Sequence, residues 1–77
     1  MVFPVYRKRV NDKHYYRIDG VESFVELQVV GDKVFQFEFS AKIYPDKVMI
    51  NDMLNLNDYG IVEISEGEYQ KIERKIK

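Results

Sequence analysis

Four side chains near the start of the chain have the types and spacing needed to bind single-stranded nucleic acid. Tyr6 and Lys8 alternate along one stretch, and Tyr15 and Arg17 alternate along the next. Residues two apart on a strand point to the same side, so a hairpin of these stretches would gather rings and cations on one face. Bases stack on such rings while the cations neutralise phosphates. Cross-strand pairs of Tyr with Lys or Arg also stabilise ordinary sheets, and we favour that structural interpretation.

His14 is the only histidine in the chain, and it lies beside a predicted turn among basic residues. A metal site built from several histidines is therefore excluded. The one catalytic role open to His14 is that of a solitary acid or base beside a carboxylate. In this basic setting we expect a solvated side chain and no catalysis.

The acidic residues and glycines follow no catalytic or metal-binding pattern. The segment 55–60, followed by Glu66, is superficially similar to a calcium loop, but Asn55 and Tyr59 stand where that loop places carboxylate ligands. Glu66 is better explained in the first turn of a helix, where negative charge meets the helix dipole. The four glycines are scattered and form no phosphate-binding loop. We therefore expect no enzyme, no cofactor and no metal site.

Length and charge indicate one small domain, residues 1–77, with an uneven surface. The net charge is -1, which argues against a general nucleic-acid binder. Residues 1–17 carry five cations and one carboxylate, a sum of +4, so residues 18–77 sum to -5. Such a dipolar surface could orient a protein partner.

Nothing in the sequence indicates a membrane or a secreted location. No apolar run approaches the roughly 18 residues of a membrane-spanning helix, and residues 1–5 are too short for a secretory signal. The chain has no cysteine, which fits a reducing compartment. We therefore expect a cytoplasmic protein that does not contact a membrane.

The segment 33–44 gives the strongest strand signal and is predicted to anchor the core. Its apolar residues fall at every second position, so they share one face of a strand. These residues are Phe35, Phe37, Phe39, Ala41 and Ile43. The opposite face, with Gln36 and Glu38, is predicted to be the wetter side. We expect the helices to cover the phenylalanine face.

The segment 20–30 fits two structures. Asp19 and Glu22 form a capping box, which indicates a helix. The alternation of branched side chains over 25–29 indicates instead a strand that turns at Gly31 into the anchor. The same order, a strand followed by a capping box, recurs at Ser65 and Glu68. On that basis we predict the helix and keep the strand as the alternative.

Four further elements complete the prediction. Residues 3–10 and 14–18 are expected to pair as a hairpin that turns at Asn11 and Asp12. The others, in chain order, are a short helix over 46–54, a strand over 61–64, and a helix that Ser65 caps through a box with Glu68.

Together these elements predict an α+β domain with a small antiparallel sheet of about four strands and helices packed on one face, in the order β-β-α-β-α-β-α. A homodimer could cover apolar surface through sheet edges or through Met49, Met53, Leu54 and Leu56. The function we favour is a small non-catalytic protein-interaction module of unknown specificity. The alternative is single-stranded nucleic-acid binding through the first hairpin.

Overall fold

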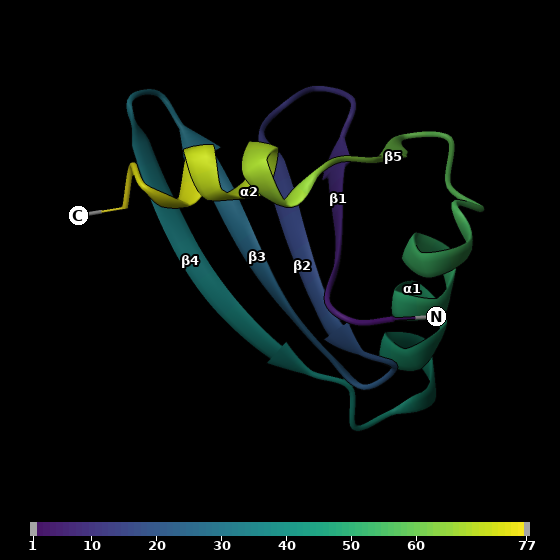
Figure 1. The fold of residues 1–77 in the computed structure, drawn as a ribbon. Helices are drawn as coiled ribbons and strands as arrows, with labels where there is room; N and C mark the ends of the chain where they lie inside the picture. The colour runs from purple at the N-terminus through teal and green to yellow at the C-terminus, as the bar shows by residue number, and fades with distance from the viewer. Residues whose placement is uncertain (1, 77) are drawn as a thin grey trace.

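A computed structural model describes residues 2–76 and shows a five-stranded antiparallel sheet with two helices (Figure 1). The α+β class is as predicted. The strands lie in the order β4-β3-β2-β1-β5 across the sheet. Neither helix of residues 2–76 is long and apolar enough to cross a membrane. In chain order the elements are β1 (Val5–Arg9), β2 (His14–Gly20), β3 (Ser23–Val30), β4 (Lys33–Ser40), α1 (Tyr44–Asn55), β5 (Ile61–Glu63) and α2 (Glu66–Glu73).

The hairpin of β1 and β2 forms and turns at the predicted residues, Asn11 and Asp12. Val5 lies opposite Ile18, and the pairing continues toward the turn. Asp12 adopts a positive φ of 61°, which aspartate tolerates better than most residues. The Asn11 side chain accepts a hydrogen bond from the backbone amide of Lys13 at 2.9 Å. The predicted turn residues therefore close this hairpin.

β3 shows that the predicted helix over residues 20–30 is wrong and that the alternative strand is correct. β3 pairs with β2 on one side and with β4 on the other. Asp19, the predicted helix cap, accepts a hydrogen bond from Arg17 Nε at 2.9 Å instead. Gly31 carries the chain into β4 with a φ of 62°, a conformation that favours glycine. Two neighbouring strands and branched side chains outweigh a local capping signal.

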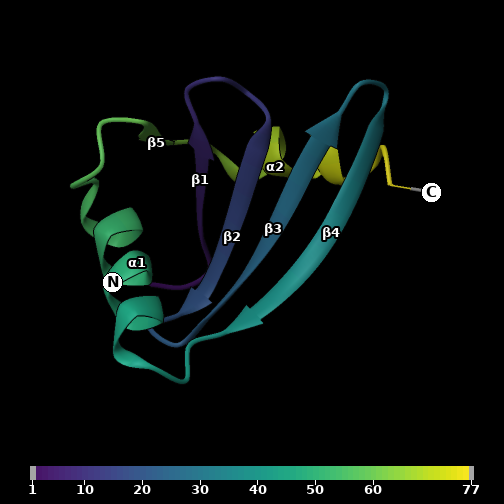
Figure 2. The same ribbon diagram turned by 180° about the vertical axis from the view of Figure 1, so that it is seen from behind.

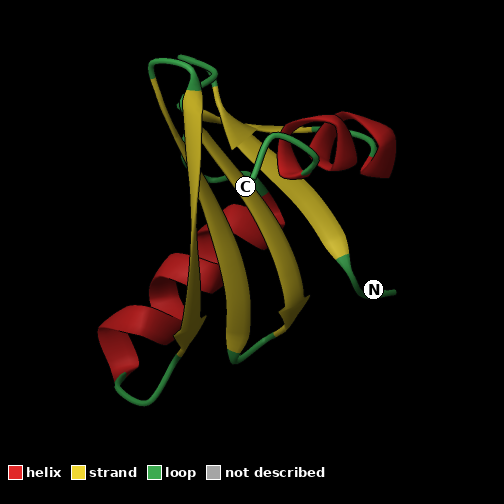
Figure 3. Cartoon of the chain, turned by 90° about the vertical axis from the view of Figure 1, so that its left-hand side faces the viewer, coloured by secondary structure: helices red, strands yellow, loops and turns green. Residues whose placement is uncertain are grey.

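The two helices pack on opposite faces of the sheet, so the prediction that they share one face is wrong (Figure 3). The adjacent residues Tyr15 and Tyr16 make this clear, because neighbours on a strand point to opposite sides. Tyr16 belongs to the cluster that contains Ile50 of α1. Tyr15 belongs to the cluster that contains Tyr69 of α2. Both faces of β2 are therefore buried, and the core has two separate halves.

β4 is an outer strand of the sheet and does not anchor the core (Figure 2). Its phenylalanines, predicted to be covered, keep 46% (Phe35), 43% (Phe37) and 42% (Phe39) of their surface exposed. The buried residue of this strand is Val34, on the opposite face under α2. α1 lies at the β1 side of the sheet (Figure 2), which agrees with the exposure of the phenylalanine rings on β4. The inner strands are β3, β2 and β1, with β2 in the middle.

A buried arginine holds the end of α1. Arg7 on β1 is only 6% exposed. Its Nε donates to the carbonyl oxygen of Met53 at 3.0 Å, and its Nη2 donates to that of Leu54 at 3.3 Å. The last turn of α1 has no basic residue of its own. Arg7 therefore supplies from another element the positive charge that a helix C-terminus favours.

α2 begins as predicted, because the Ser65 Oγ accepts a hydrogen bond from the Glu68 amide at 3.2 Å. Tyr69 is the residue that this helix buries most, with 1% of its surface exposed. Its hydroxyl has no hydrogen-bond partner within residues 2–76. Burial raises the pKa of Tyr69 to about 12. The hydroxyl thus stays protonated inside the fold at pH values at which an exposed tyrosine has ionised.

The raised pKa of Tyr69 predicts alkaline unfolding. An unfolded tyrosine has a pKa near 10, so the stabilisation is complete below pH 10 and is lost as the pH rises through 12. The difference corresponds to a loss of up to about 3 kcal/mol in the free energy of unfolding. Burial also raises the pKa of Tyr15 and Tyr16, which adds to the effect. Urea unfolding at pH 8, 10 and 11.5 measures it.

The matched variant for this measurement is Tyr69→Phe. Below pH 10 it should be as stable as the parent or about 1 kcal/mol more stable, because it removes a buried hydroxyl without a partner. Above pH 10 it should lose less stability than the parent. Equal losses in both proteins between pH 9 and 12 would show that Tyr69 does not control alkaline unfolding.

Candidate protein-interaction surface

Three exposed phenylalanines form a row on one outer strand of the sheet. We call this row, Phe35, Phe37 and Phe39 of β4, the aromatic edge. The period-two spacing places all three rings on one face of the sheet. Large apolar side chains grouped on a surface indicate a site of association, whereas single exposed ones are ordinary. The aromatic edge is therefore the first candidate for a binding surface.

The same strand offers unpaired backbone groups. The Ala41 amide donates to the Glu22 carbonyl oxygen at 2.6 Å, just beyond the last residue of β4. In an antiparallel pair, hydrogen-bonded positions alternate along the strand. The odd-numbered residues of β4 therefore bond to β3, and the even-numbered residues direct their amides and carbonyls outward. The outward residues are Val34, Gln36, Glu38 and Ser40.

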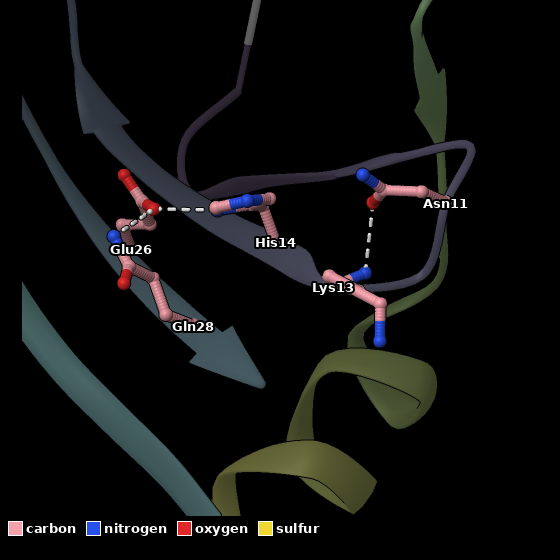
Figure 4. Close-up of polar contacts among 5 residues, drawn as sticks. All are labelled: Asn11, Lys13, His14, Glu26 and Gln28. Carbon is pink, nitrogen blue, oxygen red and sulfur yellow. Dashed lines mark hydrogen bonds and ion pairs between the residues drawn. The ribbon is translucent and has the colours of Figure 1, made fainter. Parts of the chain in front are cut away.

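A polar network borders the aromatic edge on β3 and β2 (Figure 4). Glu26, which lies opposite Phe37, has its Oε2 2.8 Å from Nδ1 of His14. The same oxygen accepts a hydrogen bond from Gln28 Nε2 at 3.0 Å. Both His14 and Glu26 are half-buried. The network gives the apolar row a polar border, which is the arrangement found in protein interfaces.

His14 and Glu26 are the histidine and carboxylate that an acid–base role would require. Within residues 2–76, no group of three or more His, Cys, Asp or Glu side chains is placed to hold a metal ion. This pair is not evident from the sequence, because the two residues are 12 apart in the chain and the capping signal predicts a helix where Glu26 lies on a strand.

At its far end the aromatic edge meets α1. Phe39 stacks on Phe24 of β3 with ring centroids 4.8 Å apart. A hollow of about 50 Å³ beside this stack is also lined by Met49 of α1, which is 44% exposed. The apolar surface thus continues from the strand to the helix. Met49 and Met53 are among the residues that the sequence suggests for a homodimer contact. Met49 borders the aromatic edge, whereas Met53 is buried in the core.

The four residues of the predicted hairpin face lie together on one face, as expected, but α2 packs over them. Tyr15 is 8% exposed. The ring of Tyr6 lies 5.2 Å from that of Tyr69, and its hydroxyl donates to Glu66 Oε2 at 2.9 Å. Stacking of a base on Tyr15 would require α2 to move away. The helix therefore takes the place that a nucleic-acid ligand would occupy.

The two cations of that face are also engaged within the domain. Lys8 pairs with Asp12 across the turn. Arg17 pairs with Asp19, with Nε 2.9 Å from Oδ1. The hydrogen bond to Asp12 raises the pKa of Lys8. Local carboxylates therefore pair with both cations that the alternative prediction assigned to phosphate binding.

No family model matches this sequence, and comparison with curated proteins and with solved structures gives no significant match. The geometry of the chain itself therefore carries the functional argument.

Proposed function

We propose that this domain is a non-catalytic module that binds a protein partner through the aromatic edge. The observation that carries the proposal is the coincidence of three exposed phenylalanine rings with the outward backbone groups of one strand. A partner strand added to such an edge gains main-chain hydrogen bonds, while the side chains on alternate positions set its specificity. A cytoplasmic location is part of the proposal, since the chain has no cysteine.

Energetics favour a covered aromatic edge. Burying apolar surface contributes about 25 cal/mol per Å², so three half-exposed phenylalanine rings together offer a few kcal/mol to a partner. Natural proteins protect exposed sheet edges with charges, prolines or bulges, because such edges pair with other chains. β4 carries two charged residues, Lys33 and Glu38, and no proline. Its outer edge therefore has little protection against pairing with another strand.

The first test of the proposed function is partner capture with matched variants. Phe37→Lys places a charge in the centre of the aromatic edge. Val10→Lys changes an exposed apolar residue in the β1–β2 turn and serves as control. A protein retained by the parent and by Val10→Lys, but lost at least about tenfold with Phe37→Lys, supports the proposal. Equal retention by all three proteins contradicts it.

Amide hydrogen exchange with the purified partner then tests the mode of binding. The amides of Gln36 and Glu38 point outward, so they should exchange rapidly in the free domain and become protected in the complex. The amides of Phe35 and Phe37 already bond to β3 and should change little. Protection that spares Gln36 and Glu38 would show that the partner binds elsewhere.

A further inference from the structure

We infer that the partner of the aromatic edge is a second copy of this chain, joined by antiparallel pairing of β4 with itself about a two-fold axis at Phe37. The inference rests on the proposed function and names the occupant of that surface. The dimer would extend the five-stranded sheet of each copy into one continuous sheet. Hydrogen-bond alternation, side-chain register and charge all favour this pairing.

Hydrogen-bond alternation limits how two copies of β4 can pair. The outward groups belong to the even-numbered residues, as the bond from Ala41 to Glu22 fixes. Two-fold pairing must therefore place even-numbered residues opposite even-numbered residues. The phenylalanines of both copies then lie on the same face of the joined sheet. A shift by one residue would place the phenylalanines of the second copy on the opposite face of the sheet. It would also set outward backbone groups of one strand opposite inward groups of the other.

The register with Phe37 on the axis matches the side chains best. Phe37 then faces Phe37 of the partner subunit, and Phe35 faces Phe39 of the partner subunit. The six rings form one stripe at non-hydrogen-bonded positions, where cross-strand side chains approach most closely. On the other face, Gln36 lies opposite Glu38 of the partner subunit. This pairing allows up to about eight backbone hydrogen bonds.

Charge at the two ends of β4 favours the same register. Asp32 precedes the strand and Lys42 follows it, and both are exposed. Neither forms an ion pair within residues 2–76. With Phe37 on the axis, Asp32 comes beside Lys42 of the partner subunit, and the symmetry repeats this pair at the other end. The edge is thus complementary to itself in charge as well as in shape.

The neighbouring registers lack this complementarity. A shift in one direction places Glu38 opposite Glu38 of the partner subunit, so two like charges would meet on the axis. A shift in the other direction places Glu38 opposite Val34 of the partner subunit and separates Asp32 from Lys42. Like charges directly opposite on a sheet are destabilising. One register therefore satisfies the backbone, the rings and the charges together.

Sedimentation and light scattering test whether the parent chain is a dimer. We expect a mass twice the 9.2 kDa of the chain at high micromolar concentration. Phe37→Lys puts two lysines together on the axis and should weaken dimerisation by at least about 100-fold. Val10→Lys should leave it unchanged. Circular dichroism of each variant verifies that the fold is retained.

Cysteine cross-linking tests the axis itself. The chain has no cysteine, so one can be introduced without a background. Phe37→Cys places two thiols at a close non-hydrogen-bonded pair, and mild oxidation should yield a disulfide-linked dimer. Tyr59→Cys, at a residue that is 97% exposed away from β4, should form no disulfide-linked dimer under the same oxidation. Equal cross-linking of the two variants counts against the axis.

A charge exchange tests the register. Asp32→Lys or Lys42→Asp alone sets like charges beside each other at both ends of the pairing, and each should weaken the dimer by about tenfold. The double variant restores opposite charges and should recover the parent affinity. Absence of recovery overturns this register, because no other even-numbered register places these two residues together.

The outcomes separate the dimer from the proposed function. A parent chain that stays monomeric up to about 1 mM overturns the dimer. If that monomer binds a different purified protein with protection of Gln36 and Glu38, the proposed function stands. If it binds none, both fail. A dimer that Phe37→Lys does not weaken and that Phe37→Cys does not cross-link uses another surface and also overturns the inference.

Discussion

Replacing Arg7 with alanine is expected to lower the free energy of unfolding by about 3–5 kcal/mol. The guanidinium is buried and donates to the carbonyl oxygens of Met53 and Leu54 at the end of α1. Its removal leaves two buried acceptors without partners, each costing about 1–3 kcal/mol, and opens a cavity where the side chain packed. Urea unfolding followed by circular dichroism measures the change.

Arg9→Ala is the matched control for this prediction. Arg9 lies two residues along the same strand, but it is partly exposed, and its Nη1 lies 3.6 Å from Asp58 Oδ2. Exposed ion pairs of this kind contribute about 0–1 kcal/mol. Arg7→Lys should fall between the two alanine variants, because an ammonium cannot reproduce the fork that reaches both carbonyls. Similar losses for Arg7→Ala and Arg9→Ala would show that Arg7 does not hold α1.

Local signals predicted the elements whose stability is local. The hairpin of β1 and β2 depends on turn residues that tolerate positive φ, and its register follows from the turn. The start of α2 depends on Ser65, whose cap is formed by residues three apart. Such features need no knowledge of the rest of the fold, and the structure shows both of them.

The failed predictions concern residues whose environment is set by distant parts of the chain. A capping box at Asp19 indicated a helix, but two neighbouring strands make Ser23–Val30 a strand. The alternation in β4 identifies a strand with one apolar face, but it does not tell whether a helix covers that face. A row of phenylalanines at an interface has the same pattern as a row in a core.

The role of Arg7 also depends on distant residues. In the sequence it is one of several cations in a basic hairpin. In the structure it crosses to the end of a helix that lies more than forty residues further along the chain. The signal that could have revealed it is the absence of any basic residue in the last turn of α1, since that helix end needs a positive charge from elsewhere.

The second large effect is expected at Leu27. Leu27→Ala should lower the free energy of unfolding by about 2–5 kcal/mol, because the side chain is 0% exposed and packs between β2, β4 and α2. Phe37→Ala removes a larger side chain but should cost the monomer only about 1 kcal/mol, since much of the ring is already in water. Sequence periodicity alone ranks these two residues in the opposite order.

Protein concentration separates the two contributions of Phe37. Below the dissociation constant of the dimer, urea unfolding reports the monomer, so Leu27→Ala should cost far more than Phe37→Ala. Above it, association stabilises the parent by mass action but not Phe37→Ala, so the difference between these two proteins should grow with concentration. The loss at Leu27 should change little. A cost at Phe37 that equals the cost at Leu27 in dilute protein would restore β4 as the core strand and remove the basis for an interface there.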